Sequence, residues 1–272
     1  MLFISSRKDL DNENEIGADQ FWDIKIVREL ATDRDELPTG IAALKEAVAG
    51  KKVLIIVHGY NNEFDDIIRA YDLIEGHTAK QMKGKYDIVI GYTWPGGDSK
   101  FDYGAAKRRA GVLAPRFAEN LRQLHSSKTR PKSIDIMTHS MGSRLALKAL
   151  GTLNTKNVVR NLFLTAPAVD NECLEHGEEH FTANSKVGNT FVFHSKRDGT
   201  LRFAYAAAEW DRALGLHGPE DPADIMKHSK HTLVINCKHK IGGHGDYKTQ
   251  EDIYKFLNKQ VEGVSSNQFS TL

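Results

Sequence analysis

Residues 134–147 read IDIMTHSMGSRLAL, and this stretch decides the fold. An apolar strand pattern ends at Thr138, and a helical pattern starts directly after Ser140. A sharp strand–turn–helix elbow of this kind lifts a serine hydroxyl above the end of a sheet. Free N–H groups at the start of the helix favour the negative charge that develops during nucleophilic attack. The stretch therefore predicts Ser140 as a catalytic nucleophile.

The elbow departs from the usual pattern G-x-S-x-G at its first position, which holds Thr138. A branched side chain is unexpected there because the turn is crowded. Gly142 keeps the second small position, where the helix has to pass close to the strand. The N–H of Met141, directly after the serine, is the expected first donor to an oxyanion. The alternative is a serine that only caps the following helix.

Short apolar runs alternate with longer helical patterns along most of the chain. Residues 53–57 are apolar without alternation, as in a strand that is covered on both faces. The alternation predicts a mostly parallel, eight-stranded α/β sheet with helices on both faces, in which the first two strands can pair antiparallel at one edge. The predicted strands are residues 2–5, 22–27, 53–57, 87–94, 133–138, 161–166, 189–195 and 232–237.

The helical patterns cover residues 41–48, 64–82, 103–125, 143–153 and 250–261. A single domain over residues 1–262 is expected, because no repeat or change in composition marks a second one. Residues 201–230 lie between the last two strands, with a helix expected at 204–214. They form either a cap over the site or a crossover helix with a loop. Residues 263–272 are expected to be a disordered tail.

The sequence HGYNN follows the strand at residues 53–57. Gly59 lets the backbone turn there, so that the N–H of Tyr60 can serve as the second oxyanion donor. Asn61 belongs to the same turn and is expected to line the pocket. His58 and His139 are also expected in the pocket, as structural residues rather than proton carriers.

A serine needs a base and an acid that orients the base. The chain order serine, acid, histidine fits Asp198, after the strand at 189–195, and His244, after the strand at 232–237. Glycines flank His244 and suit a loop that reaches over the site. Asp170 remains the alternative acid, and His239 the alternative base.

Residues 176–180, HGEEH, match an inverted zinc-protease pattern. On a helix, His176 and His180 would be able to share a zinc ion. Gly177 breaks such a helix, and no third ligand follows. We therefore expect a solvated polar loop or short helix, and no metal site.

The charges nearly balance, since 37 Lys and Arg face 36 Asp and Glu. No nucleic-acid partner is therefore expected. The two cysteines argue against a disulfide framework and favour a reducing compartment. Without a signal-peptide core or an apolar run long enough for a membrane anchor, the sequence indicates a cytoplasmic protein. Four arginines are expected as surface charges: Arg108, Arg109, Arg144 and Arg202.

Taken together, these segments resemble one bacterial α/β-hydrolase family, long known only as a domain of unknown function. Its motifs are an HGYN loop, an S-W-P segment after the next strand and an H-S-M-G elbow. This sequence has HGYN at 58–61 and HSMG at 139–142, with Thr93 in place of the serine before Trp94-Pro95. The resemblance covers roughly residues 2–261.

The resemblance implies the α/β-hydrolase fold, a nucleophile at Ser140, a histidine matching His244 and an acid at Asp198. It also makes Trp94 a structural wall of the pocket at a strand end. It implies no substrate.

The expected activity is that of a serine esterase, which cleaves a carboxylic ester or related acyl bond of a small molecule through an acyl-enzyme. No metal or organic cofactor is required. Two alternatives stay open. The same triad would serve an acyltransferase, and the same fold would serve a non-catalytic binding module.

Overall fold

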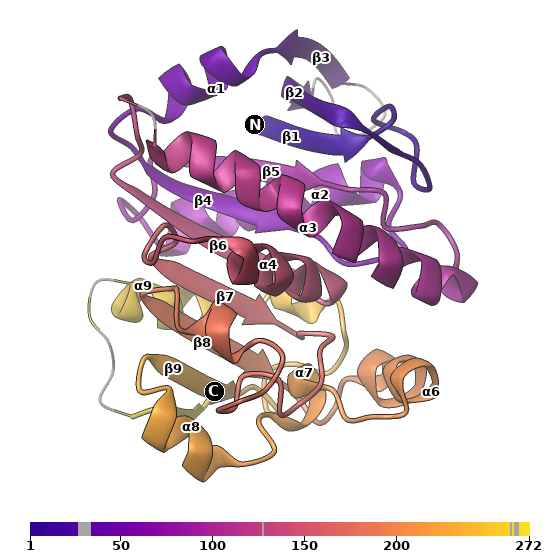
Figure 1. Cartoon of the computed structure of the whole chain (residues 1–272), viewed down its shortest axis with the longest axis vertical. Helices are drawn as coiled ribbons and strands as arrows, with labels where there is room; N and C mark the ends of the chain where they lie inside the picture. Colours follow the sequence, from indigo (N-terminus) through magenta and orange to yellow (C-terminus); the bar gives the residue numbers. More distant parts are fainter. Residues whose placement is uncertain (27–33, 127, 262, 264–266) are drawn as a thin grey trace.

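The computed structural model describes residues 1–26, 34–126, 128–261, 263 and 267–272. Within them, ten strands form one mixed sheet in the order β10-β9-β8-β7-β6-β4-β5-β1-β2-β3 (Figure 1). The strands are β1 (Leu2–Arg7), β2 (Ile16–Ile26), β3 (Arg34–Thr39), β4 (Lys52–Val57), β5 (Ile88–Thr93), β6 (Ser133–His139), β7 (Asn161–Thr165), β8 (Asn189–His194), β9 (Thr232–Asn236) and β10 (Phe269–Thr271).

All eight predicted strands are present, although Val27 lies outside the described residues. The predicted number of strands, eight, is wrong because β3 and β10 extend the two edges of the sheet. β3, with the sequence RDELPT, is mostly exposed and contains a proline, which edge strands tolerate. The tail was expected to be disordered, yet Phe269–Thr271 pairs in parallel with β9. Neither strand carries the apolar run on which the prediction depended.

The sheet is parallel from β10 to β1, and β1–β2 and β2–β3 are antiparallel. The expected antiparallel edge is thus confirmed. β4 lies between β5 and β6, so the chain crosses to opposite sides of β4 at this point. Open α/β sheets bind ligands outside the carboxyl ends of strands at such a switch point. Val57 at the end of β4 is in register with Thr138, two residues before Ser140.

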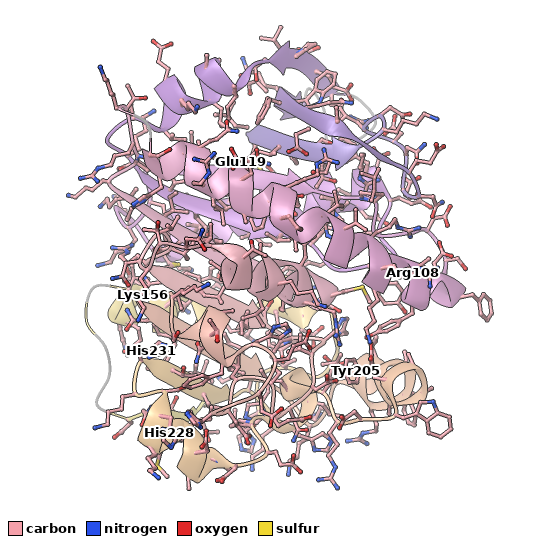
Figure 2. All side chains as sticks on the ribbon, in the orientation of Figure 1. Arg108, Glu119, Lys156, Tyr205, His228 and His231 are labelled. Atoms are coloured by element: carbon pink, nitrogen blue, oxygen red, sulfur yellow. The ribbon has the colours of Figure 1, made fainter. Side chains whose placement is uncertain are left out.

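Helices cover both faces of the sheet (Figure 1). α3 and α4 pack together on one face, and α2 and α9 pack together on the other. Alternate residues of β4 bury themselves against the two layers, Ile55 against the first and Ile56 against the second. Arg108 and Glu119 lie on the outer side of α3 (Figure 2). The longer helices are α1 (Ile41–Val48), α2 (Phe64–Gln81), α3 (Tyr103–Ser126), α4 (Met141–Thr152) and α9 (Glu251–Gln260).

The segment between β8 and β9 contains a helix close to the one expected at residues 204–214. A helical turn at Leu201–Tyr205 runs into α6 (Ala206–Glu209), above the carboxyl end of the sheet. This helix is shorter than predicted, because Trp210 adopts a left-handed conformation (φ 59°) that ends it. α7 (Leu214–His217) follows, and α8 (Pro222–His228) leads into β9. None of the helices in the described part of the chain is long and apolar enough to cross a membrane.

Candidate active site

Ser140 sits between β6 and α4 with φ 54° and ψ −124°. Such a conformation costs a non-glycine residue about 1–3 kcal/mol and occurs mainly at functional sites. Backbone hydrogen bonds hold it in place: the Ser140 N–H donates to the Thr165 carbonyl at 3.0 Å, and the Ala168 N–H donates to the Ser140 carbonyl at 3.2 Å. The predicted elbow is therefore present, and the end of β7 helps to hold Ser140 in its strained conformation.

Gly142 allows α4 to cross the end of β4. A Cβ atom at this position would lie 2.4 Å from the carbonyl oxygen of His58 and 2.7 Å from that of Val57. No real Cβ contact is so short, so any larger residue would push α4 away from β4. The glycine thus fixes the spacing between Ser140 and the loop that follows β4.

We expect Gly142→Ala to lower the free energy of unfolding by about 3 kcal/mol, because overpacked cores lose this much when backbone has to shift. Urea denaturation measures the change. Gly111→Ala is the matched control, since a Cβ at Gly111 within α3 meets no atom within 4 Å. The control should gain about 0.5–1 kcal/mol from the better helix propensity of alanine. An unchanged midpoint for Gly142→Ala would show that the crossing tolerates a wider spacing.

Thr138, the departure from the usual elbow pattern, is accommodated by hydrogen bonds. Its Oγ1 lies 2.8 Å from Oγ of Ser143 and donates to the carbonyl oxygen of Phe163 at 3.3 Å. The hydroxyl of Thr165 donates to the carbonyl oxygen of Thr138 at 2.7 Å. The branched side chain is therefore satisfied inside the turn.

Asp198 and His244 meet although 46 residues separate them. Nδ1 of His244 lies 2.7 Å from Oδ2 of Asp198. The carboxylate is fully buried, and its other oxygen accepts the N–H of Leu201 at 3.0 Å. A buried carboxylate held in this way fixes the orientation of the imidazole and places a proton on Nδ1.

His139 anchors the loop that carries His244. Its Nε2 lies 2.8 Å from the carbonyl oxygen of His244, and the two rings are 4.6 Å apart. Burial, followed by the nearby charge of His244, lowers the pKa of His139 to about 3. The ring is thus neutral at pH 7, and its Nε2–H donates to the carbonyl. The elbow itself therefore holds the loop of the candidate base, a contact that the sequence did not reveal.

The alternative acid, Asp170, and the alternative base, His239, lie outside the cavity that contains Ser140. Asp170 accepts a hydrogen bond from the hydroxyl of Tyr205, beside α6 (Figure 2), and lies 4.0 Å from the Arg144 guanidinium. His239 is exposed, and neither it nor Asp170 lines the cavity that contains Ser140. The geometry thus brings Asp198, and not Asp170, to His244.

Two backbone N–H groups are available beside Ser140. Met141 is the first residue of α4, and the N–H groups of a first helical turn have no partner within the helix. The N–H of Tyr60 donates to no acceptor in the described ranges. A Cβ at Gly59 would lie only 2.9 Å from the Cβ of Ser140, so the loop passes directly beside the serine. Asn61 holds that loop, since its N–H donates to the Gly96 carbonyl at 3.1 Å.

Trp94 supports the loop from behind. It is fully buried and is not among the residues that line the cavity, so its expected place in the pocket wall is wrong. The indole N–H donates to the His58 carbonyl at 3.0 Å, and the Trp94 backbone N–H donates to Nε2 of His58 at 3.1 Å. The two rings stack at 5.6 Å. Trp94 packs behind His58 because these bonds fix it there.

His58 should make stability depend on pH. Burial, followed by the charge of Arg7, holds its pKa well below the ordinary 6.5. As the pH falls, the unfolded chain binds a proton that the folded chain excludes. The stabilisation is therefore complete above pH 6.5 and declines by about 1.4 kcal/mol per pH unit below it. Urea unfolding at pH 7 and pH 5 should show a smaller difference for His58→Gln than for the wild type. Equal differences would mean that His58 is protonated in the folded state.

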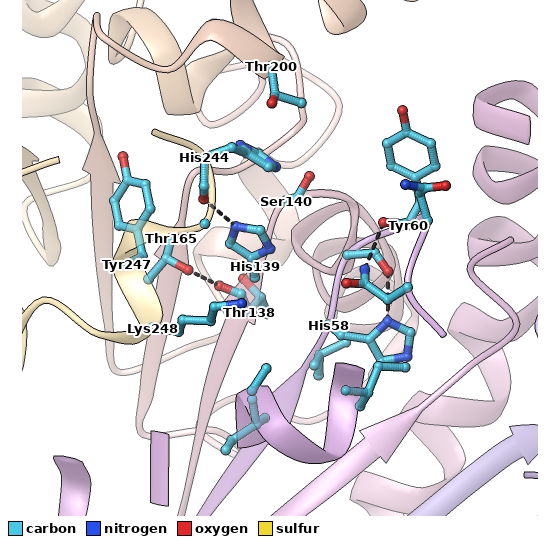
Figure 3. Close-up of a pocket in the computed structure, with 18 of the residues that line it drawn as sticks. His58, Tyr60, Thr138, His139, Ser140, Thr165, Thr200, His244, Tyr247 and Lys248 are labelled. Atoms are coloured by element: carbon cyan, nitrogen blue, oxygen red, sulfur yellow. Dashed lines mark hydrogen bonds between the residues drawn. The ribbon is translucent and has the colours of Figure 1, made fainter. Parts of the chain in front are cut away.

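A cavity of about 510 Å³ opens at the carboxyl ends of β4 and β6. Figure 3 shows Ser140 between the His139–His244 pair on one side and the loop that carries Tyr60 on the other. The lining includes these predicted residues: His58, Gly59, Tyr60, Asn61, His139, Ser140 and His244. Sequence reasoning missed the wall that α2 and α9 contribute.

Residues 34–236 match the family described as "Alpha/beta hydrolase of unknown function (DUF900)". The match covers three quarters of the chain. This chain belongs to the DUF900 family of α/β hydrolases. The family assignment confirms the fold that the motifs predict. None of the curated proteins matches the sequence significantly.

Solved structures resemble the DUF900 chain at low identity. The 2,6-dihydroxy-pseudo-oxynicotine hydrolase matches at 12% identity and a TM-score of 0.47, over 90% of this chain and 64% of that protein. The ydeN gene product of B. subtilis matches at 13% identity and a TM-score of 0.43, over 78% of this chain and 98% of that protein. Carboxyl esterase 2 from Tuber melanosporum matches at 12% identity and a TM-score of 0.39, over 98% of this chain and 78% of that protein. The chain thus spans less than two thirds of the first of these proteins.

The HGEEH stretch of the DUF900 chain is not a helix. Gly177 has φ 94°, and His180 is buried rather than solvated as predicted, because its N–H donates to the Cys173 carbonyl at 2.8 Å. Burial lowers the pKa of His180 to about 4. Among the residues that the structure describes, no three His, Cys, Asp or Glu side chains are grouped to hold a metal ion.

Proposed function

We propose that this chain is a serine hydrolase that cleaves a carboxylic ester or a related acyl bond. The carrying observation is the 2.7 Å hydrogen bond from His244 to the buried Asp198, at a cavity that the Ser140 elbow also lines. A structural histidine has no need of a buried carboxylate partner at the mouth of a cavity. A triad needs both.

In the proposed reaction, His244 takes the proton of the Ser140 hydroxyl as that oxygen attacks the substrate carbonyl. The N–H groups of Tyr60 and Met141 hold the negative oxygen of the tetrahedral intermediate. His244 then gives the proton to the leaving alcohol, and the C–O bond breaks to leave an acyl-enzyme. A water molecule, deprotonated by His244, releases the acid and frees Ser140.

The contact between Ser140 and His244 is itself part of the proposal. Within the described residues, no hydrogen bond joins the Ser140 hydroxyl to the His244 ring. Catalytic hydrogen bonds are often long without substrate and tighten in the complex. The Asp198–His244 bond and the shared cavity support the assignment.

Labelling with a fluorophosphonate probe tests the proposal. Activated serines displace fluoride from such probes, so wild-type protein should gain one adduct, which peptide mapping places on Ser140. Ser140→Ala and heat-unfolded wild type are the controls, and neither should react. A folded wild-type protein without an adduct would favour the binding module. Transfer of the acyl group to an added alcohol faster than to water would favour the acyltransferase.

A further inference from the structure

The cavity has an apolar wall that the proposed chemistry does not use. Four residues of α2 form one stripe along the helix, at spacings of three and four residues: Ile67, Ala70, Tyr71 and Ile74. The apolar lining also includes Ile56 from β4, Met137 from β6 and Ile253 from α9. With the stripe they belong to one buried apolar cluster, against which the partly buried Ala70 packs.

This end of the cavity is buried, and the side chains of the stripe carry no charge. Ile67, Tyr71 and Ile253 are each 1% exposed. The one hydroxyl in the stripe is satisfied, because Tyr71 donates to the Tyr92 carbonyl at 2.7 Å. An apolar group that enters here loses contact with water and leaves the Tyr71 hydroxyl paired.

The other end is open. Thr200 and Phe203 line it and are exposed, and Phe203 is 72% exposed. His244 lies on this side, near Thr200 (Figure 3). Because His244 has to protonate the leaving group, the leaving alcohol belongs on the open side. The acyl group then points toward the closed side.

We infer that the closed end of the cavity binds the linear, apolar acyl chain of the substrate, so that this hydrolase prefers medium-chain fatty-acyl esters over acetyl esters. The inference rests on the proposed function. The stripe from Ile67 to Ile74 spans seven residues. At 1.5 Å per residue this is about 10 Å, which fits a chain of roughly eight carbons.

The first test is a series of p-nitrophenyl esters from acetate to dodecanoate. Each methylene buried should raise kcat/KM about fourfold. The gain should stop near octanoate, where the closed end is full. Equal kcat/KM across the series, with Ser140 still labelled by a fluorophosphonate, would overturn the inference and leave the proposed function intact. No hydrolysis and no label would overturn both.

The second test fills the cavity. Ala70→Phe places an aromatic ring in the stripe and should lower the ratio of octanoate to acetate kcat/KM at least tenfold. Ala79→Phe is the matched control, because Ala79 lies on the same helix, is exposed and does not line the cavity. It should leave the ratio unchanged. Thermal unfolding shows whether both variants are folded.

A readout without turnover covers the case in which Ala70→Phe hydrolyses too slowly. The rate of labelling by octyl and methyl fluorophosphonates reports entry to the cavity, and the octyl preference should fall in Ala70→Phe. Esters with a long alcohol and an acetyl group separate the two orientations. If octyl acetate, and not the octanoate ester, gains from its chain, the cavity holds the alcohol and the inference is wrong.

Discussion

Ser140→Ala is expected to lower kcat for ester hydrolysis by about a million-fold, the loss seen when the triad serine is removed from a serine protease. The loss is so large because Ser140 Oγ forms the covalent bond that every later step depends on. Steady-state hydrolysis of p-nitrophenyl esters, at high enzyme concentration, measures it. A loss below about a hundredfold would mean that another group carries the reaction.

Ser140→Gly separates the chemistry from the fold. It removes the same hydroxyl, and it also relieves the strain of a side chain at φ 54°. We expect it to be as inactive as the alanine variant and more stable than it by about 1 kcal/mol. Thermal unfolding of the two variants tests this. Equal stability would mean that the elbow carries little strain.

Asp198→Asn is expected to lower kcat about ten-thousandfold, with little change in fold. An asparagine oxygen can still accept the N–H of Leu201, which now donates to Oδ1. Its amide group then faces Nδ1 of His244, where Oδ2 lies now, and donates a hydrogen bond instead of accepting one. The imidazole is forced into the tautomer that carries its proton on Nε2, and that nitrogen can no longer accept the serine proton.

Asp170→Asn is the matched control for the acid. Asp170 binds Tyr205 and lies near Arg144, away from the cavity, so its loss should affect stability more than kcat. Activity per folded molecule, corrected by the unfolding curve, makes the comparison. If Asp170→Asn loses activity and Asp198→Asn keeps it, the acid assignment is wrong.

Local patterns were sufficient for the centre of the fold. The elbow at Ser140 and the run at residues 53–57 are dictated by neighbours in sequence, because a strand covered on both faces must be apolar throughout. The antiparallel edge also followed from the pattern. β3 and β10 did not, since edge strands depend on backbone pairing more than on side chains.

In the candidate site, too, local patterns predicted some features and missed others. The contact between Asp198 and His244 could be predicted because chain order and strand ends limit the choice. The burial of Arg144, which sequence reasoning assigned to the surface, depends on Glu209 and Asp170 from distant segments. The inward stripe of α2 and the place of Trp94 behind His58 likewise depend on long-range packing. No local pattern encodes which neighbour a helix face will meet.

The bond between His139 and the His244 carbonyl has an evolutionary consequence. It ties the loop of the candidate base to the elbow, so that Ser140, His244 and the loop of Tyr60 are all supported by carboxyl ends of strands in one sheet. Leu201–Tyr205 and α6 hold none of these groups, although Phe203 and Ala204 line the cavity. Descendants of this chain are therefore free to exchange that segment and acquire new substrates while the reaction chemistry is inherited unchanged.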